Sequence, residues 1–99
     1  MTEWQVVIHP LVFEEDFRRI SRDIQQEIIK AIRKKLTVAP QSYGEPLLGD
    51  YKSYWKLRVG DFRVIYRINK NQLEVLVIKV GIRRDDEVYQ ALASRLRNI

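Results

Sequence analysis

Cationic side chains alternate with apolar ones along residues 54–67, and this segment offers the clearest candidates for chemistry. Gly60 and Asp61 at its centre are typical of a two-residue turn, so the segment predicts a β-hairpin. The register of that hairpin places Arg58 opposite Arg63 on one face. Like charges that face each other destabilise a hairpin, and this face has no carboxylate of its own to offset them. A bound phosphate backbone would offset the repulsion, which favours a polyanion as the partner of this face.

The same face carries three more side chains suited to nucleic-acid binding. Lys56 and Arg67 add positive charge, and Tyr54 is able to stack on a base. Two other interpretations stay open, namely a solvated basic surface and ion pairs with the acidic run at 85–87. The opposite face of the hairpin is apolar and is expected to face the core; it holds Trp55, Leu57, Val59, Phe62, Val64 and Tyr66.

Other catalytic groups are scarce in this chain. His9 is the only histidine, which excludes a two-histidine ribonuclease mechanism, and its place before Pro10 favours a structural role. Asp85, Asp86 and Glu87 occupy consecutive positions of an expected helix, so their carboxylates cannot all ligate one metal ion. They suit the positive end of that helix instead. With no cysteine present, thiolate catalysis and cysteine-bound zinc are excluded as well.

Lysine, arginine and tyrosine remain as the groups that could act on RNA. RNA can be cut without a metal if its 2′-hydroxyl attacks the neighbouring phosphate. That reaction needs a proton acceptor, stabilisation of the charge on the phosphorane, and help for the leaving 5′-oxygen. The planar fork of arginine matches phosphate oxygens. A tyrosine can exchange protons only if cationic neighbours lower its pKa from about 10.

Length and composition predict one small soluble domain. The chain has 99 residues, of which 45% are hydrophobic, and its formal net charge is +5. The charge is uneven, because residues 1–50 carry a net −1 and residues 51–99 a net +6. The N-terminal stretch lacks the pattern of a signal peptide, and no apolar run is long enough to span a bilayer. A cytoplasmic protein that binds no membrane is therefore expected.

The hydrophobic spacing predicts the element order β-α-α-β-β-β-α. A period of two indicates strands, a period near 3.6 indicates helices, and the Pro- and Gly-rich residues 40–50 indicate a loop. The α+β class is expected, with a mainly antiparallel sheet, two antiparallel helices packed on one face and a C-terminal helix. The strands are expected at 3–8, 54–59, 62–68 and 73–80, and the helices from Pro10, from Ser21 to before Pro40, and from Asp85.

Two separated motifs resemble the RelE/ParE toxin superfamily, and the resemblance covers nearly the whole chain. The first is Lys56-Leu57-Arg58, the turn, and Phe62-Arg63-Val64-Ile65-Tyr66, preceded by Pro46-Leu47-Leu48-Gly49. The second is Val80-Gly81-Ile82-Arg83-Arg84-Asp85-Asp86-Glu87-Val88-Tyr89, which is similar to the "VGxR…VY" ending of RelE. The resemblance implies a single RelE-like toxin domain over 1–99, of the kind that cuts mRNA in the ribosomal A site without metal or cofactor.

The resemblance also assigns roles to individual residues. Arg63 and Arg83 would bind and neutralise the scissile phosphate, and Lys56 would hold the attacking oxygen or lower its pKa. Tyr89 would stack on a base, exchange a proton, or do both. The residues expected to bind RNA are Lys52, Tyr54, Arg58, Arg67 and Arg84.

One position departs from the RelE pattern. Some RelE proteins have a further catalytic lysine two residues before the position of Lys56, and here that residue is Tyr54. Lys52 is an alternative source of that amine. The identity of the general base therefore stays open.

The resemblance implies partners and leaves two other functions to compare. A cognate antitoxin similar to RelB and a ribosome with mRNA in its A site are expected partners, and operator DNA only through the antitoxin complex. One alternative is a ParE-like toxin, which shares the fold, acts on DNA gyrase and is no nuclease. The other is a non-enzymatic module that binds RNA or an operator.

Overall fold

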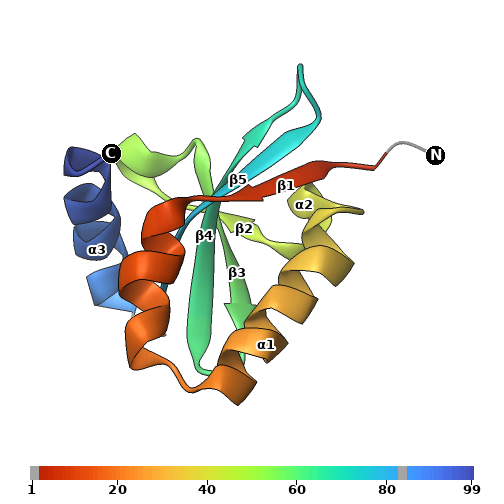
Figure 1. Cartoon of the computed structure of the whole chain (residues 1–99). Helices are drawn as coiled ribbons and strands as arrows, with labels where there is room; N and C mark the ends of the chain where they lie inside the picture. The colour runs from red at the N-terminus through yellow and green to blue at the C-terminus, as the bar shows by residue number, and fades with distance from the viewer. Residues whose placement is uncertain (1–2, 83–84) are drawn as a thin grey trace.

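A five-stranded sheet in the order β1-β5-β4-β3-β2 forms the centre of the computed structural model (Figure 1), which describes residues 3–82 and 85–99, apart from the side chains of 85–88. β1 runs parallel to β5, and every other neighbouring pair is antiparallel, as the sequence predicts for most of the sheet. The strands are β1 (Gln5–Ile8), β2 (Glu45–Pro46), β3 (Tyr54–Val59), β4 (Phe62–Asn69) and β5 (Glu74–Ile82).

The two expected N-terminal helices are present, but each is partly irregular. The first consists of a π-type segment η1 (Val12–Asp16) and a 3₁₀ turn η2 (Phe17–Arg19), and the second of α1 (Arg22–Ala31) and a π-type segment η3 (Ile32–Leu36). Ser21 lies at the N-cap of α1, as predicted, but its side chain makes no capping bond. The amide of Gln25 instead donates to the carbonyl oxygens of Phe17 and Ile20, both at 2.7 Å. These bonds fix the turn that joins the two helices.

Residues 40–50 hold short ordered elements where the sequence predicted only a loop. They form α2 (Pro40–Tyr43) and β2, and η4 (Gly49–Tyr51) follows. Pro46 fits the edge strand because its missing N–H is not needed there. Gly44 is required by the packing, since a Cβ at this position would lie 1.8 Å from Tyr66 Oη.

Tyr66 anchors this segment to the centre of the sheet. Its side chain is fully buried, and its hydroxyl donates to the carbonyl oxygen of Pro40 at 2.7 Å. Burial raises the pKa of Tyr66 well above its ordinary value of 10.0, because the charged phenolate would lose its hydration.

The sheet is covered on both faces, which makes three layers. η1, η2, α1 and η3 pack on one face over a core that includes Phe17, Ile28, Leu57 and Val64. α3 (Asp85–Arg97) packs on the other face, where Leu92 contacts a smaller cluster. Figure 1 shows α3 and α1 on opposite sides of the sheet. Within the described residues, no helix has the length and apolar character needed to cross a membrane.

Candidate nucleic-acid interface

The β3–β4 hairpin has the register predicted from its sequence. Gly60 has a φ of +56°, a conformation that a two-residue turn requires and that glycine adopts without strain. The structure pairs Tyr54 with Arg67, Lys56 with Ile65, and Arg58 with Arg63. These six residues therefore share the face of the sheet on which α3 lies.

An apolar cluster under α3 interrupts this face, which the sequence predicts to bind a polyanion. The cause is Ile65, which lies among the cationic positions and is buried beneath Leu92. Tyr54 packs against the same cluster and is half-buried. Only part of its side chain is therefore accessible to a base. The buried members of the cluster are Leu47, Ile65, Ile78 and Leu92.

Arg63 lies at one end of the interrupted face and lines a cleft of about 600 Å³. Its side chain is only 4% exposed, which is unusual for an arginine. Lys56 lies on the neighbouring strand, two residues before Arg58, which is the partner of Arg63 in the register. Its side chain is half-buried. Both side chains make contacts within the protein. The structure thus brings two of the four predicted catalytic residues together on one side of the hairpin.

The cations at the other positions of the face do not join this cleft. Arg67 is exposed and lines a separate hollow of about 560 Å³ near the tip of the β4–β5 hairpin, together with Lys70. Arg58 is exposed beside Arg63, and Lys52 is exposed in the segment that leads into β3. Any strand of RNA that touches all of these residues would have to pass around α3.

Tyr89 connects α3 to the segment before β3. Its hydroxyl accepts a hydrogen bond from the backbone N–H of Leu48 at 3.0 Å. Its ring lies 6.0 Å from that of Tyr51, and its side chain packs against the apolar cluster. Tyr89 therefore has a structural role, and the hydroxyl that was predicted to act in catalysis is bound to the backbone.

Arg83 and Arg84 lie outside the described residues, so their predicted roles stay predictions. His9 has the structural role expected from the sequence, because its Nδ1 accepts a hydrogen bond from the N–H of Leu11 at 3.1 Å. Within residues 3–82 and 89–99, no cluster of three or more histidine, aspartate or glutamate side chains is arranged to hold a metal ion.

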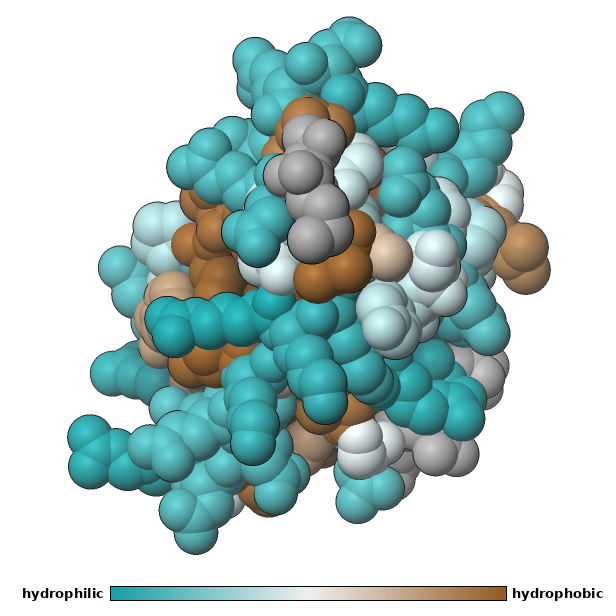
Figure 2. All heavy atoms as spheres, turned by 90° about the vertical axis from the view of Figure 1, so that its right-hand side faces the viewer, coloured by the Kyte–Doolittle hydropathy of each residue, from teal (hydrophilic) through white to brown (hydrophobic). Residues whose placement is uncertain are grey.

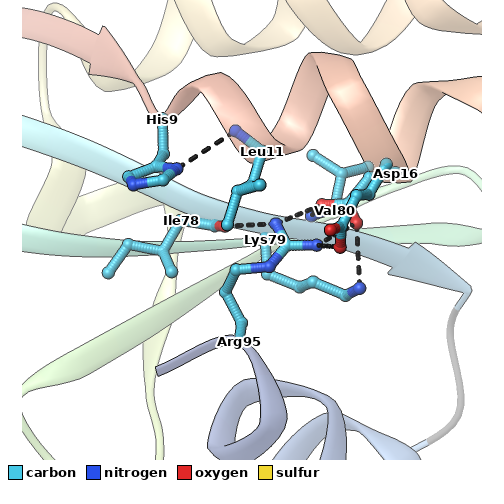
Figure 3. A network of polar contacts seen from close by, with 8 residues as sticks. His9, Leu11, Asp16, Ile78, Lys79, Val80 and Arg95 are labelled. Atoms are coloured by element: carbon cyan, nitrogen blue, oxygen red, sulfur yellow. Dashed lines mark hydrogen bonds and ion pairs between the residues drawn. The ribbon is translucent and has the colours of Figure 1, made fainter. Parts of the chain in front are cut away.

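A buried ionic network fixes α3 next to the cleft (Figure 3). One carboxylate oxygen of Asp16 accepts from Lys79 Nζ at 2.9 Å and from Arg95 at 2.7 Å. The other accepts from Arg95 at 3.1 Å and from the N–H of Val80 at 2.9 Å. Arg95 also donates to the carbonyl oxygen of Ile78 at 3.1 Å. Asp16 thereby joins the first helix, the edge of β5 and α3 in one cluster.

The sequence did not single out this network or the arginines of the neighbouring turn. The signal that was present is the acidic pair Glu15 and Asp16 followed by Arg18 and Arg19. Nothing in the spacing distinguishes these residues from an ordinary solvated helix face. They lie together at the cleft because η1 packs against the free edge of β5, beyond the end of β1.

Comparison with known proteins identifies the family. The family model of the ParE toxin of the type II toxin-antitoxin system parDE matches residues 6–87 of this chain. A RelE-like toxin protein of Escherichia coli is 31% identical over 84 residues, which is 84% of this chain and 87% of that protein.

Solved structures share the fold at lower identity. The toxin–antitoxin complex RelBE2 of Mycobacterium tuberculosis gives a TM-score of 0.77 at 22% identity and covers 84% of this chain and 94% of that chain. A mutant of the E. coli toxin RelE in the free state gives 0.70 at 19% identity, with coverages of 94% and 97%. The archaeal RelE–RelB complex of Pyrococcus horikoshii gives 0.64 at 24% identity, with coverages of 84% and 97%. The chain belongs to the RelE/ParE superfamily of type II toxin–antitoxin toxins.

Proposed function

We propose that this toxin is a ribosome-dependent endoribonuclease that cuts mRNA in the A site by attack of the RNA 2′-hydroxyl, without a metal ion. The observation that carries the proposal is the position of Arg63. A buried arginine lines an open cleft of about 600 Å³, with Lys56 on the adjacent strand of the same face. A cleft of this volume is of the size that holds a small ligand or one unit of a polymer.

The environment of Arg63 suits the stabilisation of a phosphorane. The side chain is almost fully removed from water, so its charge acts on a phosphate at a lower effective dielectric constant than a surface arginine would. The planar fork of an arginine side chain matches the oxygens of a phosphate. The burial also limits side-chain motion, which reduces the reorganisation needed during the reaction.

The other residues receive their roles from the family motif. Lys56 holds the attacking oxygen or lowers its pKa, and Arg83 shares the phosphate with Arg63. Tyr89 contributes after its bond to Leu48 is exchanged for one to RNA. The residues that guide the RNA are Lys52, Tyr54, Arg58, Arg67 and Arg84.

The proposal includes an antitoxin similar to RelB as a partner, and operator DNA only through that complex, in the cytoplasm. Two of the similar solved structures are RelE–RelB complexes, from E. coli and Pyrococcus horikoshii. The face with α1 and α2 is hydrophilic with apolar patches between the polar side chains (Figure 2), and Val38 and Tyr43 are among the exposed apolar residues. Exposed apolar surface of this kind is what a wrapping partner would cover.

A ParE-like toxin that acts on DNA gyrase is the second candidate. The observation in its favour is the ParE name of the family model that matches residues 6–87. The presence of Lys56 and Arg63 in the hairpin motif favours the RelE activity, since ParE-like members usually lack this set.

Mapping of RNA 5′ ends after brief induction tests the proposal. Cuts in phase with codons, confined to translated messages, are expected for the native chain and should disappear for Arg63→Ala. Arg33→Ala is the matched control, because Arg33 is exposed on η3 and lies outside the cleft. DNA damage without RNA cuts would replace the proposal by the ParE-like function. If neither RNA cuts nor DNA damage are found, the proposal is overturned, and the result favours a non-enzymatic binding module.

A further inference from the structure

The cleft that Arg63 lines extends beyond the predicted catalytic residues to the turn between η1 and α1. Arg18 and Arg19 lie on this turn, are exposed, and line the same cleft. No hydrogen bond or ion pair of their guanidinium groups is found among the described residues. Their charges are therefore available to a ligand that enters the cleft.

The acidic residues of the cleft do not oppose a polyanion. Asp16 has both carboxylate oxygens bound by Lys79, Arg95 and a backbone N–H, and its side chain is 2% exposed. Glu15 is 56% exposed and pairs with Arg95 at 3.1 Å. Lys79 and Arg95 offset these two carboxylates, so the exposed Arg18 and Arg19 add positive charge to the described lining of the cleft.

The turn that carries the two arginines is rigidly held. The amide of Gln25 donates to the carbonyl oxygens of Phe17 and Ile20, which are the residues on either side of Arg18 and Arg19. Phe17 and Ile20 are themselves buried in the main core. The guanidinium groups thus project from a fixed base, which lowers the entropy cost of binding.

We propose that Arg18 and Arg19 bind the phosphates of the RNA strand next to the scissile phosphate, so that the cleft holds the nucleotide adjacent to the cut. This inference rests on the proposed ribonuclease function, because it takes Arg63 as the group at the scissile phosphate. It adds a backbone-binding subsite on η2, which lies on the edge of the cleft away from the β3–β4 hairpin. The strand would run from the hairpin past Arg63 to the η2 turn.

Binding of a short RNA oligonucleotide with 2′-O-methyl riboses tests this subsite without requiring cleavage. The full-length native chain, the double variant R18Q/R19Q and the control R33Q/K34Q are titrated by fluorescence anisotropy at several salt concentrations. The control removes two exposed charges that line a different hollow on α1 and η3. Thermal unfolding of each variant checks that the fold is retained, and R18K/R19K provides a second variant that keeps both charges.

R18Q/R19Q should lose affinity roughly tenfold to a hundredfold, as two charge-assisted contacts would imply. The slope of log K against log salt should fall by about 1.4 in magnitude, at ~0.7 per phosphate on a single strand. R18K/R19K should keep the native slope, and R33Q/K34Q should keep the native affinity. Equal losses in R18Q/R19Q and R33Q/K34Q, or no binding by the native chain, would overturn the subsite.

Cleavage on programmed ribosomes separates this inference from the proposed function. If R18Q/R19Q cuts poorly but binds the oligonucleotide as well as the native chain, the two arginines contact the ribosome and the subsite is wrong. If the native chain cuts no mRNA, the ribonuclease function fails, whereas arginine-dependent oligonucleotide binding would still support a phosphate subsite in the cleft.

Discussion

The two faces of the sheet differ in what they bury. The face under α1 buries a large cluster of apolar side chains, in which Tyr66 is the one buried residue with a polar group among the residues described. The face under α3 has a smaller apolar cluster with Arg63 and Arg95 buried around it, and Asp16 of η1 binds Arg95 across the edge of β5. The first face supplies most of the hydrophobic stabilisation. The face under α3 buries less apolar area and holds charged groups beside a cleft, which is typical of a functional surface.

The charged groups on the second face stabilise the fold only as a complete set. Removing two charges from water costs several kcal/mol per ion, and close partners must offset that cost. The loss of one partner is then more damaging than the loss of an apolar side chain of similar size.

Asp16→Ala should have the largest effect on stability. It leaves Arg95 buried without its main partner and removes the acceptor of the Val80 N–H, so the free energy of unfolding should fall by about 3–5 kcal/mol. Glu15→Ala is the control, since its 56% exposed carboxylate binds the same arginine and should contribute less than about 1 kcal/mol. Urea unfolding measures both. Equal losses for the two variants would show that the network adds no more than a surface pair.

Ile28→Ala tests the apolar face. Ile28 is fully buried, and the cavity left behind should lower the free energy of unfolding by about 2–5 kcal/mol. Ile29 is only half-buried, so Ile29→Ala should lower the free energy of unfolding by less than Ile28→Ala does. Both variants should cut RNA at the native rate per folded molecule. Cleavage is measured in a translating extract, at a temperature below the unfolding temperature of each variant. A specific loss of cleavage in Ile28→Ala would show that the two faces are not functionally separate.

Tyr66→Phe should lower the free energy of unfolding by about 1–3 kcal/mol near neutral pH, because the buried carbonyl of Pro40 loses its donor. Burial raises the pKa of Tyr66 in the folded chain, so the unfolded chain ionises first, from about pH 10. The stability of the native chain should therefore fall above that pH, and its advantage over Tyr66→Phe should shrink. Urea unfolding from pH 7 to 11 measures this, with Tyr43→Phe as an exposed control. A constant difference across the range contradicts the expected titration.

Tyr89→Phe should have the smallest effect on stability, about 0.5–1.5 kcal/mol, because it removes one hydrogen bond to an exposed backbone N–H. Its effect on cleavage decides whether the hydroxyl acts in chemistry. A cleavage rate well below that of the native chain, with the unfolding temperature nearly unchanged, is expected. Native cleavage by Tyr89→Phe would restrict this residue to its structural role.

Much of the site could be predicted from the sequence because its positions depend on local rules. Gly60 and Asp61 determine the turn, and alternation then assigns every side chain of the hairpin to a face. The paired Arg58 and Arg63 were correctly placed for the same reason. The strands β1, β3, β4 and β5, the start of α3 and the structural role of His9 also follow from short-range patterns.

Features that depend on tertiary contacts could not be predicted. The apolar cluster over Ile65 exists because α3 crosses the face, and a helix at the end of a chain can pack on either side of a sheet. An acidic residue such as Asp16 in the first turns of a helix is typical of a favourable interaction with the helix dipole, whereas in the structure it accepts a hydrogen bond from the free edge of β5. The order within residues 40–50 likewise depends on Tyr66, which contacts this segment from the centre of the sheet.

Single-turnover cleavage of mRNA on programmed ribosomes tests the role of Arg63 most directly. Arg63→Ala and Arg63→Lys are compared with the native chain and with Arg33→Ala, each at a temperature where unfolding measurements show it to be folded. Arg63→Ala should cut at least about 100-fold more slowly, the effect expected when one main donor to the transition state is removed. Arg63→Lys should recover only part of the rate, since it keeps the charge but loses the fork. Cleavage by Arg63→Ala at the rate of Arg33→Ala would contradict the assignment of the cleft as the catalytic centre.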